Sequence, residues 1–153
     1  MTKEFGTDFI RELGDDLLEY GFQVQRLEDE EDENEPDTLR CGVVLESGIP
    51  LLMDINFYQV DTYSVLQIYA YIRGEVDEKE KIRIAPMLEE CNCFSPIGHF
   101  GYYENGLYYR YGMAFEEDET VKSAVDRSET ALELLISTID INLRKMGFAD
   151  EKR

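Results

Sequence analysis

The segment "CNCFSPIGH" holds the three side chains with the clearest capacity for chemistry: Cys91, Cys93 and His99. A histidine within reach of a thiol can activate it as a nucleophile, and the two residue types together can bind zinc. A structural zinc site needs four ligands at spacings such as C-x2-C, however, and the one further cysteine, Cys41, is distant in sequence. A small cysteine- and histidine-based enzyme, or a metal-dependent sensor, is therefore the alternative hypothesis for this sequence.

The rest of the sequence offers no catalytic motif. It contains no phosphate-binding glycine loop and no G-x-S-x-G elbow. No acid and base pair can be singled out among its 34 acidic residues. We therefore expect a protein that is not an enzyme, and we assign it no catalytic, cofactor-binding or metal-binding residue and no cofactor.

The charge balance limits the partners of the protein. The chain carries 34 acidic and 15 basic residues, a net charge of -19, so its surface repels nucleic-acid phosphates and anionic lipid headgroups. It has neither the apolar core of a signal peptide nor the roughly 20 consecutive apolar residues that span a bilayer. Three cysteines, an odd count, favour reduced thiols. The composition predicts a cytoplasmic protein that binds neither nucleic acid nor membranes.

The length of 153 residues, with 43% hydrophobic composition, predicts one compact domain that spans 1–153. Within it, residues 28–38, "EDEEDENEPDT", contain eight acids and no base. Repulsion between these like charges predicts a solvated loop. The run contains no glycine, so it does not fit an EF-hand calcium loop.

Hydrophobic periodicity predicts an α+β fold. Apolar residues recur at helical spacing over 7–20 and 124–146, and they alternate as in strands over 22–27, 39–45, 49–59 and 63–73. Two further strands follow within 95–115. We expect a single antiparallel sheet of about five strands with helices packed on one face, in the order α-β-β-β-α-β-β-α, a short first strand aside.

A helix between the two groups of strands is predicted by a capping box, in which Asp77 is followed three residues later by Glu80. Pro86 lies inside its apolar pattern and would remove one backbone hydrogen bond. The sequence leaves open whether this helix starts near Glu78 or near Ala85.

The tyrosine-rich segment "SPIGHFGYYENGLYYRYGMAF" predicts a hairpin, because Asn105-Gly106 favours a type I′ turn. This turn would pair Tyr103 with Tyr108, Tyr102 with Tyr109, Gly101 with Arg110, Phe100 with Tyr111 and His99 with Gly112. One face of the hairpin, packed on the helices, would then hold Phe100, Tyr102, Tyr109, Tyr111 and Met113. The other face would hold His99, Gly101, Tyr103, Tyr108, Arg110 and Gly112.

The alternation over 63–73 turns more tyrosines to that second face, and Tyr58 leans the same way. Tyrosine suits strands and also packs well at interfaces. The face is therefore either an ordinary solvated one, or a surface for a protein partner or for a second copy of the chain. The residues we predict to bind a partner are Tyr63, Tyr69, Tyr71, Tyr103, Tyr108 and Arg110.

The segment "CNCFSPIGHFGYYENGLYYRYGMAF", together with the element order, resembles the YbjN family of bacterial sensory-transduction-regulator-like proteins. The shared features are an asparagine near a helix end, a Pro-Ile-Gly-aromatic sequence, a short hairpin and a Tyr-Arg-Tyr strand. The long acidic loop and Pro86 depart from the family pattern.

The resemblance implies a fold similar to that of type III secretion chaperones, which are small, acidic, cytosolic homodimers that bind unfolded segments of client proteins. It implies no catalytic residues. The expected function is that of a non-enzymatic binding module, chaperone-like or regulatory, that presents its tyrosine-rich face or a strand edge to a protein partner or to itself as a homodimer.

Overall fold

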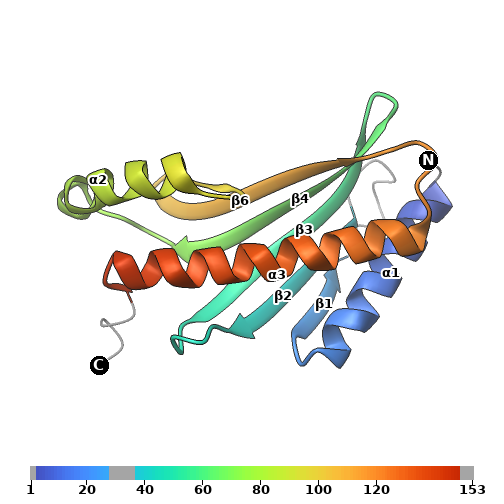
Figure 1. The fold of residues 1–153 in the computed structure, drawn as a ribbon, viewed down its shortest axis with the longest axis horizontal. Helices are drawn as coiled ribbons and strands as arrows, with labels where there is room; N and C mark the ends of the chain where they lie inside the picture. The colour runs from blue at the N-terminus through green and yellow to red at the C-terminus, as the bar shows by residue number, and fades with distance from the viewer. Residues whose placement is uncertain (1–2, 28–36, 149–153) are drawn as a thin grey trace.

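The computed structural model describes residues 3–27 and 37–148, which form three helices and a six-stranded antiparallel sheet (Figure 1). The elements are α1 (Lys3–Glu19), β1 (Gln23–Leu27), β2 (Asp37–Val44), β3 (Pro50–Val60), β4 (Tyr63–Arg73), α2 (Glu78–Phe94), β5 (His99–Tyr103), β6 (Gly106–Phe115) and α3 (Val121–Lys145). The predicted acidic loop at 28–38 lies almost wholly outside the described residues.

The sheet has the strand order β1-β2-β3-β4-β6-β5, with every neighbouring pair antiparallel. The predicted fold class and element order are confirmed, with six strands instead of about five. The strand that follows α2 in sequence, β5, lies at the edge, and β6 lies between it and β4. This places the tyrosine-rich β6 beside β4, which carries further tyrosines, with the tyrosine-rich β5 beyond it.

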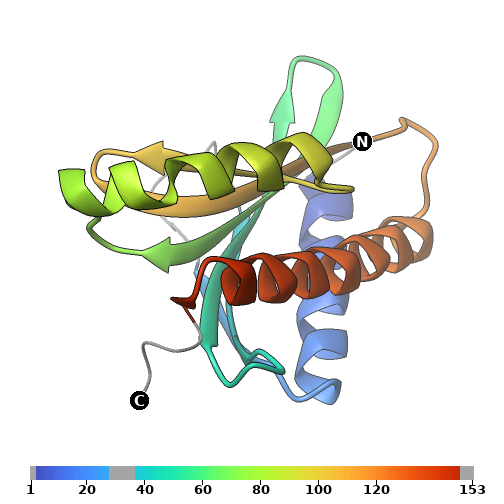
Figure 2. The same cartoon turned by 60° about the vertical axis from the view of Figure 1, so that its left-hand side comes forward.

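The inner face of the sheet packs against the helices (Figures 1 and 2). Phe9 of α1, Phe57 of β3 and Phe115 of β6 form an aromatic cluster, with ring centroids 5.2 Å apart for Phe9 and Phe57 and 5.4 Å for Phe9 and Phe115. The 25-residue α3 runs across the sheet and buries Leu132, Leu135 and other apolar residues against it. Each such side chain contributes about 1.5–3 kcal/mol of transfer free energy, which explains why the helices stay on this face.

The second helix starts at Glu78 and not near Ala85. The Asp77 side chain accepts a hydrogen bond from the Glu80 N–H at 2.8 Å, so the predicted cap forms. Pro86 lies inside the helix on its exposed side, as does Ile82, whose carbonyl would have accepted the lost hydrogen bond. Water can therefore satisfy that carbonyl, which removes the reason for a late start.

The predicted register of the last hairpin is wrong by two residues. The structure pairs His99 with Arg110, Phe100 with Tyr109, Gly101 with Tyr108, Tyr102 with Leu107 and Tyr103 with Gly106. The turn consists of Glu104 and Asn105, with a positive φ of 55° at Glu104, as at the first central position of a type II′ turn. A shift of two residues keeps every side chain on its predicted face, so the face assignment holds although the pairing does not.

Gly106 lies in β6 and not in the turn, and a side chain at this position is excluded for a steric reason. A β-carbon at Gly106 would lie 2.9 Å from the Tyr108 ring and 3.3 Å from the carbonyl oxygens of Arg73 and Gly74. The connection from β4 to α2 passes over this point, and the Val76 N–H donates to the Asn105 carbonyl at 2.7 Å. The glycine is needed for close approach of two chain segments, which the sequence pattern of a turn cannot distinguish from turn geometry.

No helix among the described residues is both long and apolar enough to cross a membrane.

Candidate binding surface

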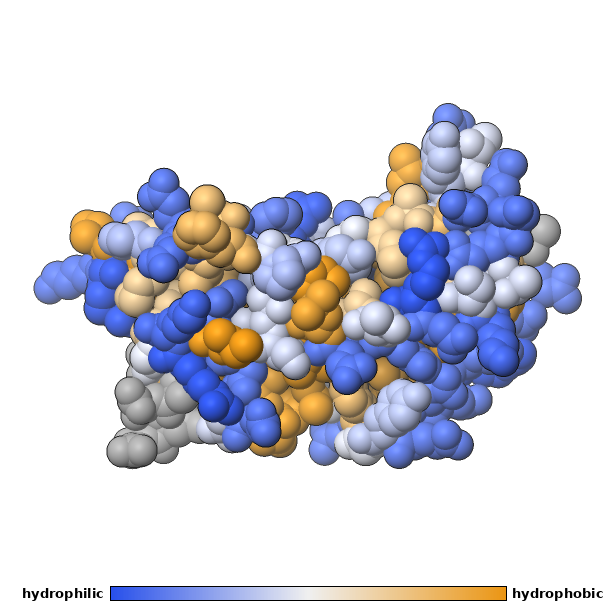
Figure 3. Space-filling model, in the orientation of Figure 1, coloured by the Kyte–Doolittle hydropathy of each residue, from blue (hydrophilic) through white to orange (hydrophobic). Residues whose placement is uncertain are grey.

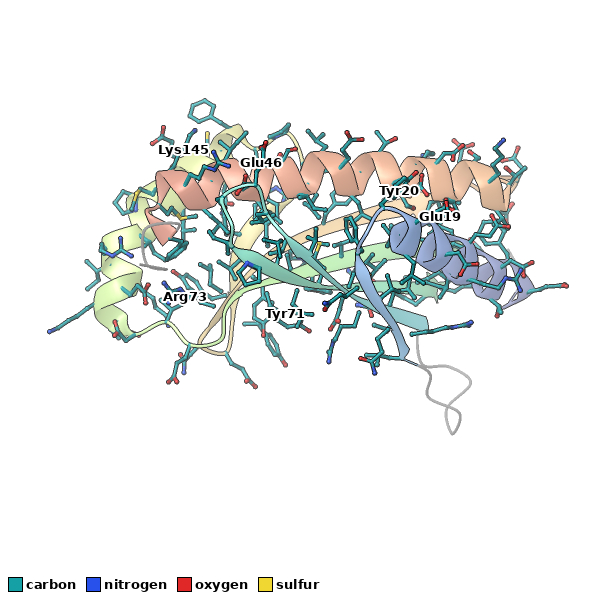
Figure 4. All side chains as sticks on the ribbon, turned by 90° about the horizontal axis from the view of Figure 1, so that it is seen from below. Glu19, Tyr20, Glu46, Tyr71, Arg73 and Lys145 are labelled. Carbon is teal, nitrogen blue, oxygen red and sulfur yellow. The ribbon has the colours of Figure 1, made fainter. Side chains whose placement is uncertain are left out.

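The face of the sheet opposite the helices, termed the outer face, is uncovered by any described element (Figures 1 and 2). Figure 4 shows Tyr71 on the side of the sheet away from α3. The strand pairings and alternating burial place these side chains on the outer face: Thr38, Arg40, Val44, Leu52, Asp54, Asn56, Tyr58, Tyr63, Val65, Gln67, Tyr69, Tyr71, His99, Tyr103, Tyr108, Arg110 and Ala114.

A carboxylate is buried in the middle of the outer face. Asp54 of β3 accepts two hydrogen bonds from the Arg40 guanidinium on β2, at 2.9 and 3.1 Å, and one from the Tyr71 hydroxyl on β4 at 2.5 Å. Burial opposes the charge of Asp54, but the hydrogen bonds from Arg40 and Tyr71 and the charge of Arg40 outweigh it, so the pKa of Asp54 is lowered. Burial and the bond to Asp54 raise the pKa of Tyr71 to about 12. The three groups form a closed, neutralised unit that ties β2, β3 and β4 together.

Arg110 of β6 lies in the same cross-strand row as this unit, because the pairings align Arg40, Asp54, Tyr69, Arg110 and His99. Its guanidinium carbon lies 5.7 Å from the centroid of the Tyr69 ring, a cation–π contact. The Tyr69 hydroxyl in turn donates to Gln67 at 3.1 Å. Both Arg110 and His99 are exposed, so a cationic group and an imidazole stand side by side at one end of the row.

Beside Arg110, the outer face holds three neighbouring tyrosine rings and a glycine. The ring centroids of Tyr71 and Tyr108 are 5.1 Å apart, and those of Tyr103 and Tyr108 are 6.4 Å apart, both in edge-to-face geometry. Gly101 pairs with Tyr108, and a β-carbon built on Gly101 would meet no atom within 4 Å. The outer face therefore has open space at Gly101, termed the hollow, with His99 and Tyr103 on either side of it along β5.

Five of the six predicted partner-binding residues lie together at this end of the sheet: Tyr69, Tyr71, Tyr103, Tyr108 and Arg110. The sixth, Tyr63, is 61% exposed at the start of β4, where the β3–β4 hairpin projects from the body of the fold (Figures 1 and 2). It is thus at the other end of β4 from Tyr71. A surface centred on Gly101 and Tyr108 does not include Tyr63.

Sequence reasoning missed Arg40 and Asp54. A signal was present, because a hairpin at Ser47-Gly48 that pairs Val44 with Pro50 also pairs Arg40 with Asp54. An acid and a base in one cross-strand pair of otherwise apolar strands indicate an ion pair.

The cysteine and histidine residues of the alternative hypothesis are not brought together. Cys91 is buried against the core, Cys93 is exposed on α2, and His99 points to the outer face. Burial raises the pKa of the Cys91 thiol, the opposite of what an activated nucleophile needs. Within residues 3–27 and 37–148, no three His, Cys, Asp or Glu side chains are grouped so that they could hold a metal ion.

The helical side carries two grooves. One lies between the end of α1 and α3 and is lined by Leu17, Tyr20, Glu129, Leu132 and neighbouring residues. The other lies between α2 and α3, where Phe94, Leu134 and Ile141 are exposed by 78%, 44% and 55%. Figure 3 shows hydrophobic side chains along this side of the molecule, interspersed with hydrophilic ones.

Comparison with solved structures finds similar chains, among them the crystal structure of YbjN, a putative transcription regulator from E. coli. The TM-score is 0.51 at 15% sequence identity, and the match covers 88% of this chain and 89% of that one. The chain has a YbjN-like fold. No protein-family model matches the sequence, and no curated protein matches it. The predicted similarity to YbjN is therefore confirmed for the fold.

Proposed function

We propose that this YbjN-like protein is a non-enzymatic binding module whose outer face docks a protein partner. The observation that carries the proposal is the charge of that face. Among the outward positions of the described strands there is one acid, Asp54, which is neutralised, and two arginines, Arg40 and Arg110, which gives a net charge of +1 with His99 neutral. The whole chain has a net charge of -19.

An outer face that is rich in aromatic side chains and poor in acids, on a protein whose acids lie elsewhere, is suited to docking a partner. Protein interfaces are depleted in acids at their centre and enriched in tyrosine and arginine. Acids over the remaining surface keep the molecule soluble and repel chance associations. An ordinary solvated face of a protein with 34 acids would carry several unpaired carboxylates, and none is found here in the described strands.

The outer face is a better docking surface than the β5 edge. The backbone N–H and carbonyl of Phe100, which point away from β6, are both hydrogen-bonded to Asn92 of α2. An incoming strand would have to displace these bonds before it could pair with β5. The partner therefore lies across the sheet, with its side chains among the tyrosines.

The name of the YbjN structure, a putative transcription regulator, bears on the kind of module. For this chain a regulatory role would act through protein contacts, because a net charge of -19 opposes DNA binding. A chaperone-like role would use the same face for an extended client segment. A second copy is a further candidate partner, since two such acidic chains repel each other least where their acid-poor faces meet.

Filling the hollow tests this proposal without damage to the fold. Gly101→Val places its side chain in open space, and valine has a high strand propensity, so the variant should fold at least as well as the wild type. We expect it to lose a protein that the wild type retains from native cytosol, or to lose self-association by light scattering. Ile141→Ser, an exposed change on α3, is the matched control and should retain both.

The opposite pattern would contradict the proposal. If Gly101→Val keeps the partner and Ile141→Ser loses it, the groove between α2 and α3 is the docking site and the outer face is only solvated. The same conclusion against the outer face follows if neither change affects any association.

A further inference from the structure

Arg110 lacks the carboxylate partner that other arginines of this chain have. Six described arginines form an ion pair: Arg11 with Asp8, Arg40 with Asp54, Arg73 and Arg83 with Glu80, Arg127 with Glu119 and Arg144 with Asp140. Arg110 forms no ion pair with any residue of the described part of the chain, and its guanidinium carbon lies 5.7 Å from the centroid of the Tyr69 ring. In a protein with more than twice as many acids as bases, this is an exception that needs a cause.

The residues around Arg110 explain why it forms no ion pair. The nearest acid in its cross-strand row, Asp54, is already engaged by Arg40 and Tyr71. The positions next to Arg110 on the outer face are Tyr108 and Gly112 along β6, Tyr69 across on β4 and His99 across on β5. None of them is an acid, and the Arg110 side chain is exposed, so its guanidinium can donate hydrogen bonds to a group outside this chain.

We propose that Arg110 binds an aspartate or glutamate side chain of the protein partner, with the partner's chain extended along β5 and β6. This inference rests on the proposed function. The edge of a guanidinium can bind a carboxylate through two parallel hydrogen bonds. The Arg40–Asp54 pair, in the same cross-strand row of the outer face, is bonded in this way. His99, beside Arg110, provides a second donor to the same carboxylate.

The hollow at Gly101 specifies a second position of the partner. Gly101 and Tyr108 form the next outward pair along the strands, two residues from the pair of His99 and Arg110. In an extended chain, residues i and i+2 point to the same side and are separated by the same length, about 6.6–6.8 Å. A partner acid over Arg110 therefore places the residue two positions away over Gly101, where an apolar side chain would fill the hollow between Tyr103 and Tyr108.

The net charge of the protein favours a carboxylate over a phosphate as the anionic group that binds Arg110. A single guanidinium can neutralise a monoanion, whereas a phosphate dianion would keep excess charge in the field of a chain with net charge -19. A partner segment with one acid in an otherwise neutral or basic sequence can pair with Arg110 and is not repelled by the net charge of -19.

The test uses random linear peptides displayed on phage, selected against the wild type, Arg110→Gln and the matched control Arg127→Gln. Arg127 is an exposed arginine of α3 whose partner is Glu119. We expect the wild type and Arg127→Gln to select peptides with an acid two residues from an apolar residue, and Arg110→Gln to lose the preference for the acid. In fluorescence anisotropy, replacing that acid with its amide should weaken binding to the wild type about tenfold and leave binding to Arg110→Gln unchanged.

The outcomes separate this inference from the proposed function. Peptides that lose binding on Gly101→Val but carry no preferred acid would overturn the inference and leave the docking face standing. The inference is likewise overturned, and the docking face kept, if the acid-to-amide change weakens binding equally for the wild type and Arg110→Gln. Peptides that are insensitive to Gly101→Val, or a selection that yields none, would overturn both.

Discussion

Asn92 on α2 is hydrogen-bonded to both backbone polar groups of Phe100 on β5. Its Nδ2 donates to the Phe100 carbonyl at 3.2 Å, and its Oδ1 accepts from the Phe100 N–H at 2.7 Å. One side chain thus substitutes for a neighbouring strand at the edge of the sheet and holds the second helix against it. The Phe100 ring is buried and meets Tyr109 edge to face at 4.6 Å, so the asparagine also positions a core residue.

Asn92→Ala should destabilise the fold by about 1–3 kcal/mol, because two backbone groups lose their partner at a half-buried position. Urea unfolding measures the loss, and amide hydrogen exchange should speed up at Phe100. The control is Cys93→Ala, a change at the next, exposed position of the same helix. Equal stability of the two variants would show that water replaces the asparagine without cost.

Several residues of the segment that carries the resemblance to the YbjN family have structural roles. The hydroxyl oxygens of Ser95 and Tyr109 lie 2.6 Å apart, and each lies 2.7 Å from the Ile97 carbonyl oxygen, so one hydroxyl donates to the other and the second donates to the carbonyl. Gly98 has a φ of 72°, and a β-carbon there would lie 2.8 Å from the Arg110 carbonyl oxygen. With Asn92, these residues form the connection from α2 to β5. This is why a motif containing cysteine and histidine need not signal catalysis.

The sequence could predict the layers of the fold because burial alternates with the period of each element. The apolar residues of β3 and β4 identify the inner face without any knowledge of strand pairing. Because side chains alternate between the two faces of a strand, the tyrosines at the intervening positions are predicted to lie on the outer face. The register of β5 and β6 could not be predicted in this way. Gly106 is required by a crossing segment remote in sequence, and such tertiary contact leaves no local periodic signal.

The candidate surface could be predicted in part. Its aromatic residues are visible as a composition bias, but the engagement of Asp54 by Arg40 and Tyr71 involves three strands at once. That Arg110 forms no ion pair with a described acid stands out only once the ion pairs of the other arginines are known.

Leu135 and Leu134 of α3 test the assignment of the core. Leu135 is fully buried against the sheet, whereas Leu134 is 44% exposed in the groove between α2 and α3. We expect Leu135→Ala to cost about 2–5 kcal/mol and Leu134→Ala less than about 1 kcal/mol in chemical denaturation. Comparable losses at both positions would mean that the α2–α3 groove is closed in solution by further packing.

Asp54 should make stability depend on pH in the acid range. Its pKa in the folded state lies below the ordinary 3.8, so its stabilising contribution is complete above that value and is lost as the pH falls through the folded pKa. Asp54→Asn should therefore lose about 1–3 kcal/mol at neutral pH, because Arg40 is left without its carboxylate at a half-buried site. The difference from the wild type should shrink steadily below pH 3.8. A constant difference across the acid range would show that packing, and not ionisation, causes the loss.

Glu129 on α3 should make stability depend on pH near neutrality, with the opposite sign. Burial, with a hydrogen bond to Asp16 and its charge, raises the pKa of Glu129 to about 7 from the ordinary 4.5. The folded state therefore binds the proton more tightly than the unfolded chain, and stability should fall as the pH rises from 4.5 to about 7. Glu129→Gln should remove this slope and stabilise the protein at pH above 7 by about 1 kcal/mol, a small value because solvent still reaches the group.

The matched control is Glu133→Gln, one turn further along α3 and exposed. It removes the same charge from the same acidic chain, so it reports the general relief of repulsion. Unfolding followed from about pH 4 to about pH 8 should show a flatter profile for Glu129→Gln alone. If both variants gain stability equally at high pH, the effect belongs to the overall charge of the protein and the contact of Glu129 with Asp16 has no role of its own.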